Sequence, residues 1–367
     1  MKYSNASKNL LFGTVAITAS LTISSSSAAK ARKAEKPNFI IILTDDQGYK
    51  DLGCFGSKTI KTPCIDKMAN EGLKLTSFYA QPVSGASRGA LMTGRYPCRI
   101  GGGFLVNQDE IMIPALLKAQ GYATACIGKW DMCQRKLQEG LLPTDKGFDY
   151  YFGTLGATDE GVVQLYRSKT TLNETNDMAS LTGLYTDEAI KFIKGKKDGP
   201  FFLYLAHSMP HVKIDASPQF KGKSAGELYG DVIEELDWNV GRIIDLLQGF
   251  GLDKNTIVLF TSDNGSWSEL EERYRAEHGG KLATGSAFPL RGGKGSPYEG
   301  GFRVPLLPNT ILVHPYAMDP VRKTPELYNL ENDISEKTNM ADKNPEMASR
   351  LLNLAQSAPS KPEIPEK

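Results

Sequence analysis

The chain has 367 residues, of which 40% are hydrophobic, and its 43 Lys and Arg residues balance 42 Asp and Glu residues. This length and composition are typical of a globular protein with a large buried core and roughly one to three domains. The balanced charge gives no reason to expect nucleic acid or an anionic membrane as a partner, so any site for an anion must be local.

The N-terminus has the order of a secretion signal. Lys2 and Lys8 precede an apolar stretch over residues 10–23, and small residues follow as far as Ala29. We therefore expect residues 1–29 to be a bacterial-type signal peptide, and the protein to be periplasmic or secreted. The alternative is a membrane anchor, but the apolar stretch is short for a span and contains Thr, Ser and Gly. No later segment is apolar enough to cross a bilayer, so we expect no stable membrane span.

The cysteines do not indicate a disulfide scaffold or a structural zinc site. They are odd in number, so at least one stays unpaired in a monomer, and no two form a Cys-x-x-Cys pair. The five are Cys54, Cys64, Cys98, Cys126 and Cys133.

From Pro37 onwards, apolar runs alternate with segments of helical period, which predicts an α/β domain with a largely parallel sheet. The predicted strands are residues 38–44, 123–127, 201–205 and 256–260, and the clearest predicted helices are residues 65–70, 113–120 and 231–247.

Each predicted strand runs into polar residues. They are Asp45-Asp46, Gly128-Lys129-Trp130, His207 with His211, and Asp263-Asn264-Gly265. In open α/β sheets the carboxyl ends of the strands form the edge at which ligands bind, so we expect these side chains to converge.

Two of these strand ends carry ligands suited to a hard cation. Asp45 and Asp46 supply carboxylates, and Asp263 and Asn264 supply a carboxylate and an amide oxygen. Such a set suits Ca²⁺ or Mg²⁺. Either pair alone could equally be a turn, because Asp, Asn and Gly favour turns.

The most informative segment covers residues 82–95. Ser84 is followed by Ala86, by Arg88 and then by Thr93-Gly94-Arg95. Part of this pattern would fit a helix that begins at a serine and carries a solvated arginine. The whole pattern resembles the signature of the formylglycine-dependent sulfatases of the serine type, which belong to the alkaline-phosphatase-like superfamily.

The resemblance covers residues 37–305 and resumes over residues 326–340. It implies an alkaline-phosphatase-like α/β fold, with a mixed, largely parallel sheet flanked by helices and a truncated C-terminal α+β subdomain. The implied domains are a sulfatase catalytic domain over residues 37–307 and a shortened C-terminal subdomain over residues 308–367.

The resemblance also implies how Ser84 becomes reactive. A serine hydroxyl is a poor nucleophile without a base, and in this family it is oxidised to formylglycine, whose hydrate attacks sulfur. The resemblance implies a calcium ion, with magnesium as the alternative, held by Asp45, Asp46, Asp263, Asn264 and the converted Ser84. The implied partner is a radical S-adenosylmethionine maturase that acts in the cytoplasm before export.

Five further residues have catalytic roles implied by the resemblance. Arg88 holds the hydroxyls and the metal carboxylates, Lys129 and Lys294 bind the sulfate group, and His211 protonates the leaving alcohol. The family commonly has histidine after Gly-Lys-Trp, and here that position is Asp131, which could accept a proton.

Two other interpretations of these motifs fail. His207 and His211 lack the glutamate of a zinc-protease helix, and Pro210 disfavours a continuous helix between them. We therefore interpret His207 as a core or capping residue. The segment around Lys294 is not a Walker loop, because Gly295 follows the lysine.

After Pro305 the chain is shorter than its family pattern. We expect this shortening to remove a strand of the sheet and part of the smaller C-terminal sheet, and so to expose apolar surface.

The expected function is hydrolysis of sulfate esters in a sulfated carbohydrate or an aryl sulfate. The alternatives are a phosphate- or phosphonate-ester hydrolase of the same superfamily, and a truncated, inactive protein that binds sulfated glycans.

Overall fold

A computed structural model of the protein describes residues 36–103, 105–268, 284–309 and 326–357. The predicted signal peptide, residues 1–29, lies outside these ranges. No helix within them is long and apolar enough to cross a membrane. All five cysteines lie within them and are free thiols.

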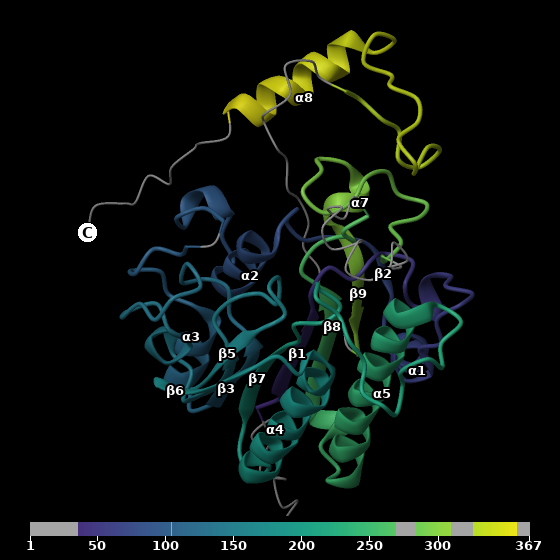
Figure 1. Cartoon of the computed structure of the whole chain (residues 1–367). Helices are drawn as coiled ribbons and strands as arrows, with labels where there is room; N and C mark the ends of the chain where they lie inside the picture. The colour runs from purple at the N-terminus through teal and green to yellow at the C-terminus, as the bar shows by residue number, and fades with distance from the viewer. Residues whose placement is uncertain (1–35, 104, 269–283, 310–325, 358–367) are drawn as a thin grey trace, which may run out of the picture. The chain divides into compact units, whose positions relative to one another are not determined.

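The described strands form one nine-stranded sheet in the order β2-β9-β8-β1-β7-β3-β4-β5-β6 (Figure 1). The five strands from β8 to β4 are parallel, and the flanking strands pair antiparallel. Their bounds are β1 Asn38–Thr44, β2 Leu75–Tyr79, β3 Ala123–Lys129, β4 Tyr150–Thr154, β5 Val163–Arg167, β6 Thr170–Thr175, β7 Phe201–Ala206, β8 Thr256–Ser262 and β9 Arg303–Pro308.

The predicted fold class is confirmed. All four predicted strands are present, as β1, β3, β7 and β8, and they are neighbours in the centre of the sheet. Thr44 at the end of β1 pairs with Ser262 at the end of β8, and Ala206 at the end of β7 pairs with Leu43. Because these strands are parallel and end together, the polar residues that follow them meet at one edge.

Helices cover both faces of the sheet, which explains why the central strands are continuously apolar rather than alternating. Ile40 and Ile42 share one core with residues of α1, α4 and α5, and Ile41 and Leu43 share the other with residues that include Met92 of α2. Full burial of each such side chain contributes roughly 1.5–3 kcal/mol.

The helices have the following bounds: α1 Pro63–Glu71, α2 Ser84–Thr93, α3 Ile113–Ala119, α4 Leu181–Lys196, α5 Glu227–Gly249, α7 Glu299–Phe302 and α8 Pro345–Ser357. Short 3₁₀ helices lie at Gly53–Phe55, Pro97–Arg99, Pro143–Lys146, Met178–Ser180 and Asp253–Asn255. The three predicted helices are confirmed as α1, α3 and α5, with α5 longer at both ends than its apolar stripe indicated.

Gly128 allows β3 to lie against β7 just before Lys129. Its φ is +103°, in the left-handed region, and a Cβ here would lie 1.8 Å from the carbonyl oxygen of Ala206. No other residue fits so close to a neighbouring backbone. The glycine therefore lets the strand bring Lys129 to the shared edge of the sheet.

The expected loss of a strand after Pro305 is wrong for the position beside β8. β9 lies between β8 and β2 and pairs antiparallel with both. The chain continues past Pro305 for long enough to complete this strand at Pro308. In the described C-terminal residues, 326–357, the regular structure consists of α8 and contains no strand.

Candidate active site

Ser84 begins α2, directly after the extended residue Val83, and its side chain is buried. Its Oγ donates a hydrogen bond to Oδ2 of Asp263 at 2.6 Å and accepts one from Nε of Arg88 at 2.8 Å. Arg88 lies one helical turn after Ser84, so both side chains point the same way. Nη2 of Arg88 donates to the same Asp263 oxygen at 2.7 Å, so Ser84, Arg88 and Asp263 form a triangle of hydrogen bonds.

Arg88 is fully buried, so its charge must be compensated within the protein. Asp263 lies at 2.7 Å, and Oδ2 of Asp45 lies at 3.8 Å. Burial by itself lowers the pKa of Arg88, but Tyr204, Asp263 and Asp45 raise it above its ordinary value. The guanidinium is therefore a permanent positive charge beside Ser84.

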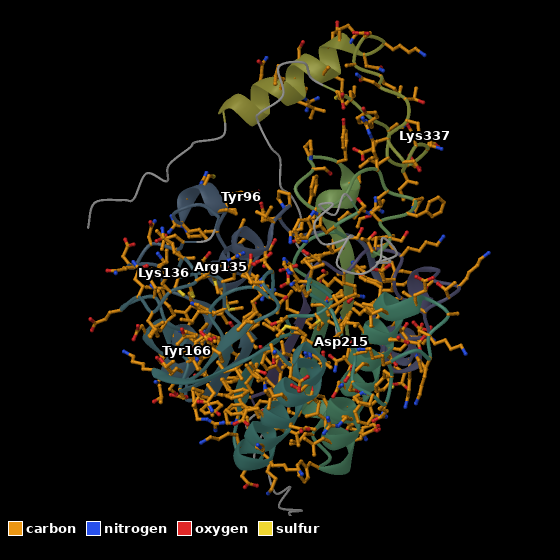
Figure 2. The ribbon with its side chains drawn as sticks, viewed as in Figure 1. Tyr96, Arg135, Lys136, Tyr166, Asp215 and Lys337 are labelled. Carbon is orange, nitrogen blue, oxygen red and sulfur yellow. The ribbon has the colours of Figure 1, made fainter. Side chains whose placement is uncertain are left out.

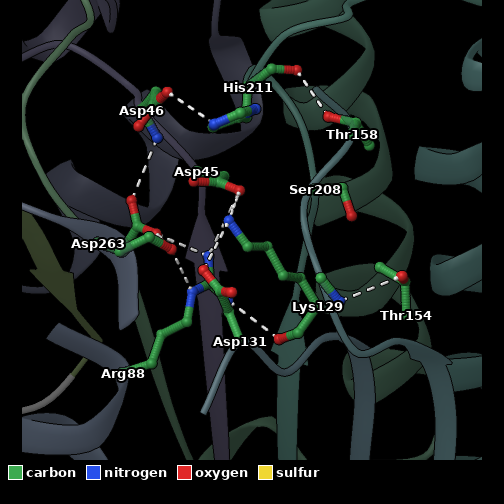
Figure 3. Close-up of polar contacts among 12 residues, drawn as sticks. Asp45, Asp46, Arg88, Lys129, Asp131, Thr154, Thr158, Ser208, His211 and Asp263 are labelled. Carbon is green, nitrogen blue, oxygen red and sulfur yellow. Dashed lines mark hydrogen bonds and ion pairs between the residues drawn. The ribbon is translucent and has the colours of Figure 1, made fainter. Parts of the chain in front are cut away.

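Asp45 and Lys129 form a second buried pair at the ends of β1 and β3 (Figure 3). Nζ of Lys129 is 2.6 Å from Oδ2 of Asp45, and neither side chain is exposed. Burial raises the pKa of Asp45, but Lys129, His211 and Arg88 outweigh it and hold the pKa below the ordinary 3.8. Asp45 is therefore a carboxylate at neutral pH.

Asp46 receives a lysine and an amide from segments far away in the sequence. Nζ of Lys294 is 2.7 Å from Oδ1 of Asp46, and Nδ2 of Asn264 donates to the same oxygen at 2.7 Å. The Lys294 ammonium also lies 4.5 Å from the ring centre of Trp267. Burial lowers the pKa of Lys294, but Asp46 and Asp45 raise it overall, so the lysine stays charged.

The donor set fits a hard divalent cation. Oδ1 of Asp45 and Oδ1 of Asn264 are buried and have no hydrogen-bond partner among the described residues. Leaving buried oxygens without a partner is unfavourable, and a cation with oxygen ligands would satisfy both. Asp45, Asp46 and His211 also present ligand atoms within 4.8 Å of one another. Carboxylate and amide oxygens predominate, as Ca²⁺ and Mg²⁺ prefer.

Asp131 is buried two residues after the end of β3 and faces two cations. Its Oδ2 is 3.4 Å from Nζ of Lys129, and its Oδ1 accepts a hydrogen bond from Nε of Arg135 at 3.0 Å. Burial raises the pKa of Asp131, but Lys129 and Arg135 lower it below 3.8 overall. The carboxylate can therefore accept a proton at neutral pH, but it has none to donate.

Arg135 and Asp159 extend this chain of charges to His211, and neither of them was expected from the sequence. Arg135 donates to Oδ2 of Asp159 at 3.0 Å, and the other Asp159 oxygen lies 3.7 Å from Nε2 of His211. Asp159 follows β4, whose end at Thr154 obeys the same rule as the four strand ends examined above. Applying that rule to residues 150–154 would have indicated the segment.

His211 lies between Asp159 and Asp46. Its Nδ1 donates to the carbonyl oxygen of Val212 at 2.6 Å, and its Nε2 faces Oδ2 of Asp46 at 3.6 Å. The Trp267 ring lies 5.6 Å away, centre to centre. All the residues expected in the site are thus within one connected polar network, and all of them except the partly buried Lys294 are buried.

His207 is a core residue, as its sequence context indicated. Its side chain is 1% exposed, it lies near the ring of Tyr185, and Nδ1 has no hydrogen-bond partner among the described residues. Burial lowers the pKa of His207 from 6.5 to about 3. The imidazole is therefore neutral and stays outside the charged network.

This depressed pKa predicts a specific acid sensitivity. Below pH 6.5 the unfolded chain protonates His207, whereas the folded chain does so only near pH 3, so acid favours unfolding between these values. As pH is lowered through this window, the free energy of unfolding should fall less steeply in His207→Gln than in the unmutated protein. The two slopes should differ by up to about 1.4 kcal/mol per pH unit. Urea unfolding at several pH values without added metal measures this, and parallel curves for the two proteins would contradict it.

Comparisons with known proteins give the family of the chain. The family model described as Sulfatase matches residues 37–308. The rat N-acetylgalactosamine-6-sulfatase (Rattus norvegicus) is 36% identical over 74% of this chain and 56% of its own length. Human steryl-sulfatase (Homo sapiens) is 32% identical over 76% of this chain and 62% of its own length. The chain thus spans a little over half the length of these two relatives.

A solved structure covers more of both chains. The crystal structure of Ps i-CgsB in complex with k-i-k-neocarrahexaose has a TM-score of 0.74 and 29% sequence identity, and it covers 88% of this chain and 92% of its own. The matched segment, residues 37–308, contains the whole central sheet and every residue expected in the site. The chain belongs to the sulfatase family.

Proposed function

We propose that this protein hydrolyses sulfate esters of carbohydrates. In this proposal Ser84 is converted to formylglycine, and a divalent cation, with calcium as the preferred candidate, is bound beside it. The observation that carries the proposal is the triangle of Ser84, Arg88 and Asp263, in which one buried hydroxyl contacts both a cation and a candidate metal ligand. Two similar proteins support a carbohydrate substrate by name, one an N-acetylgalactosamine-6-sulfatase and one bound to a neocarrahexaose. An aryl or steryl sulfate is the next candidate, given the similarity to steryl-sulfatase.

The charges of the site suit an anionic ester once a cation is bound. Five carboxylates, those of Asp45, Asp46, Asp131, Asp159 and Asp263, face the four cations Arg88, Lys129, Arg135 and Lys294. A divalent cation held by Asp45, Asp46, Asp263, Asn264 and the converted Ser84 would therefore change the local balance from negative to positive. Lys129 and Lys294 then lie where they can stabilise negative charge on a sulfuryl group.

Two side chains can move protons in this scheme. Nε2 of His211 lies at the border of the site, where it can protonate the departing alcohol oxygen. The Asp131 carboxylate can accept a proton from an attacking hydroxyl. The formylglycine hydrate would supply that hydroxyl, which an unmodified serine cannot replace. The metal would lower the pKa of the hydroxyl and polarise the sulfuryl oxygens.

The decisive experiment is to produce the chain with a serine-type radical S-adenosylmethionine maturase and to analyse the tryptic peptide of residues 75–88 by mass spectrometry. We expect Ser84 to lose two hydrogens, and the modified protein to hydrolyse an aryl sulfate faster than the matched aryl phosphate. Faster phosphate turnover would favour the phosphate- or phosphonate-ester hydrolase. An unmodified Ser84, with a control sulfatase matured alongside, would favour an inactive protein that binds sulfated glycans.

The proposal includes export after maturation. Ser84 would first be oxidised in the cytoplasm, and the expected N-terminal signal would then direct export of the protein. It also takes residues 37–307 as the catalytic domain and residues 308–367 as a shortened C-terminal subdomain.

Calcium should stabilise the protein through the oxygen ligands of the site. A ligand at 100 times its dissociation constant adds about 2.7 kcal/mol to the free energy of unfolding, so Tm should rise with calcium concentration. In Asn264→Ala the rise should be much smaller, because one buried ligand oxygen is removed. Thermal unfolding with and without calcium measures this, and Asp342→Asn, at an exposed position, is the control. An equal rise in all three proteins would place the calcium elsewhere.

A further inference from the structure

A cavity of about 260 Å³ opens beside Asp159, where the end of β4, the loop after it and β5 meet. Its wall includes Arg135, Asp159, Glu160, Val162 and Tyr166, and Arg135 and Tyr166 are labelled in Figure 2. Sites for drug-sized ligands measure roughly 300–1,000 Å³, so this cavity suits a single ring rather than a long chain.

Asp159 connects the cavity to the candidate active site. One of its oxygens lies 3.7 Å from Nε2 of His211, and its side chain also lines the cavity. His211 is the residue we propose to protonate the departing alcohol. The part of the substrate that leaves with that oxygen therefore has the cavity next to it.

Arg135 is held in place within the wall and is not an open anion site. Its stem lies against Gly156, where a Cβ would meet Arg135 side-chain atoms at 3.2–3.3 Å. Its guanidinium is bound by Asp131 and Asp159. Arg135 also has a left-handed φ of 59°, an unfavourable conformation that such contacts must maintain.

The remaining chemistry of the wall favours hydroxyl groups and disfavours anions. Oδ2 of Asp159 accepts a hydrogen bond from Arg135, so the oxygen that Asp159 can offer a ligand is Oδ1, and Glu160 adds a second carboxylate to the wall. Carboxylates accept strong, charge-assisted hydrogen bonds from hydroxyls and repel sulfate or carboxylate groups. Tyr166 and Val162 add aromatic and aliphatic surface for the face of a ring. Lys213, which follows β7, packs against Gly161 in the loop after β4. Its positive charge offsets part of the negative charge of the wall, so the repulsion of anionic groups should be moderate.

We propose that this cavity binds an uncharged sugar ring next to the sulfated one, and that it disfavours a neighbouring ring with its own sulfate or carboxylate. This inference rests on the proposed function, because it assumes that the substrate is a sulfated saccharide. It assigns Glu160 and Tyr166 as specificity-determining residues.

The test measures binding by calorimetry to the full chain with unmodified Ser84, in calcium, so that no turnover occurs. The probes are four disaccharides in which galactose, sulfated at O4 or at O6, is linked to uncharged N-acetylglucosamine or to glucuronate. For the sulfate position that binds, we expect the disaccharide with the uncharged neighbour to bind at least about tenfold more tightly. Equal or tighter binding of the glucuronate disaccharide, or no binding of any probe, would overturn the inference.

Two variants show whether the cavity is responsible. Glu160→Gln keeps the shape of the side chain and should narrow the preference at least about threefold, because one negative charge is removed. Tyr166→Ala should weaken binding of the uncharged probe by about tenfold. Glu139→Gln, the same change at an exposed position outside the cavity wall, should leave the preference unchanged. An unchanged preference in Glu160→Gln would also overturn the inference.

The two proposals can fail separately. If Ser84 is oxidised and aryl sulfate is hydrolysed while the disaccharides show no preference, the proposed function stands and the inference falls. If the disaccharides bind with the expected preference but Ser84 remains unmodified under maturation, the cavity assignment stands and the hydrolytic function falls.

Discussion

Ser84→Ala is expected to abolish sulfate-ester hydrolysis in protein that has been produced with the maturase. Alanine carries no oxygen, so neither formylglycine nor a hydroxyl can lie between Arg88 and Asp263. Loss of a nucleophile typically lowers kcat by roughly 10⁴-fold or more. Steady-state hydrolysis of an aryl sulfate, with metal present, measures the effect.

Ser87→Ala is the matched control for this experiment. Ser87 lies in the same helix, and its Oγ makes its hydrogen bonds with the backbone of Gln81 rather than with the charged network. This variant should lose some stability, about 1–3 kcal/mol, but should retain turnover. Sulfatase activity remaining in Ser84→Ala would show that the nucleophile is a different residue.

Arg88→Met should cause the largest loss of stability of any single change in the site. Methionine is similar in length to arginine but carries no charge. The variant therefore removes the buried cation that lies 2.7 Å from Asp263 and 3.8 Å from Asp45. Removing one partner of a buried ion pair typically costs about 3–5 kcal/mol. Urea unfolding of the metal-free protein measures this loss, and turnover should be lost with it.

Arg242→Met provides the comparison at the protein surface. Arg242 pairs with Asp187 at 2.5 Å, but the Asp187 side chain is 55% exposed. An exposed pair contributes about 1 kcal/mol or less, so this variant should lose far less stability. If the two variants were equally stable, Arg88 would not be the residue that compensates the buried carboxylates.

Much of the fold could be predicted from local patterns. Apolar runs of strand length, each ending in polar residues, identified β1, β3, β7 and β8, because strands buried on both faces are continuously apolar. The antiparallel strands at both sides of the sheet were not identified. β2, β5 and β6 are only partly buried, so their sequences lack the same apolar signal. β9 is buried throughout, but it contains Pro305 and Pro308, and proline argues against a strand.

The motif around Ser84 similarly indicated the residues of the site but not how they pair. Lys129 and Lys294 were both expected to bind sulfate, and the structure places one on Asp45 and the other on Asp46. Asp131 was expected to be able to accept a proton, and the structure shows two cations that keep its carboxylate ionised. The strand-end rule, applied to β4, would have indicated the segment of Asp159, but no local pattern predicts that Arg135 joins Asp159 to Asp131.

The sequence by itself determined the family, the class of fold and which side chains gather at the carboxyl edge of the sheet. Those features depend on short-range patterns: the period of apolar residues, the residues that end each strand, and the spacing from Ser84 to Arg95. The tertiary structure alone decided the strand order, the place of β9 and the partner of each buried charge. Many of these contacts join residues far apart in the sequence: Lys129 and Asp45 are 84 positions apart, and Asn264 and Asp46 are 218 positions apart. They depend on packing that no local segment specifies.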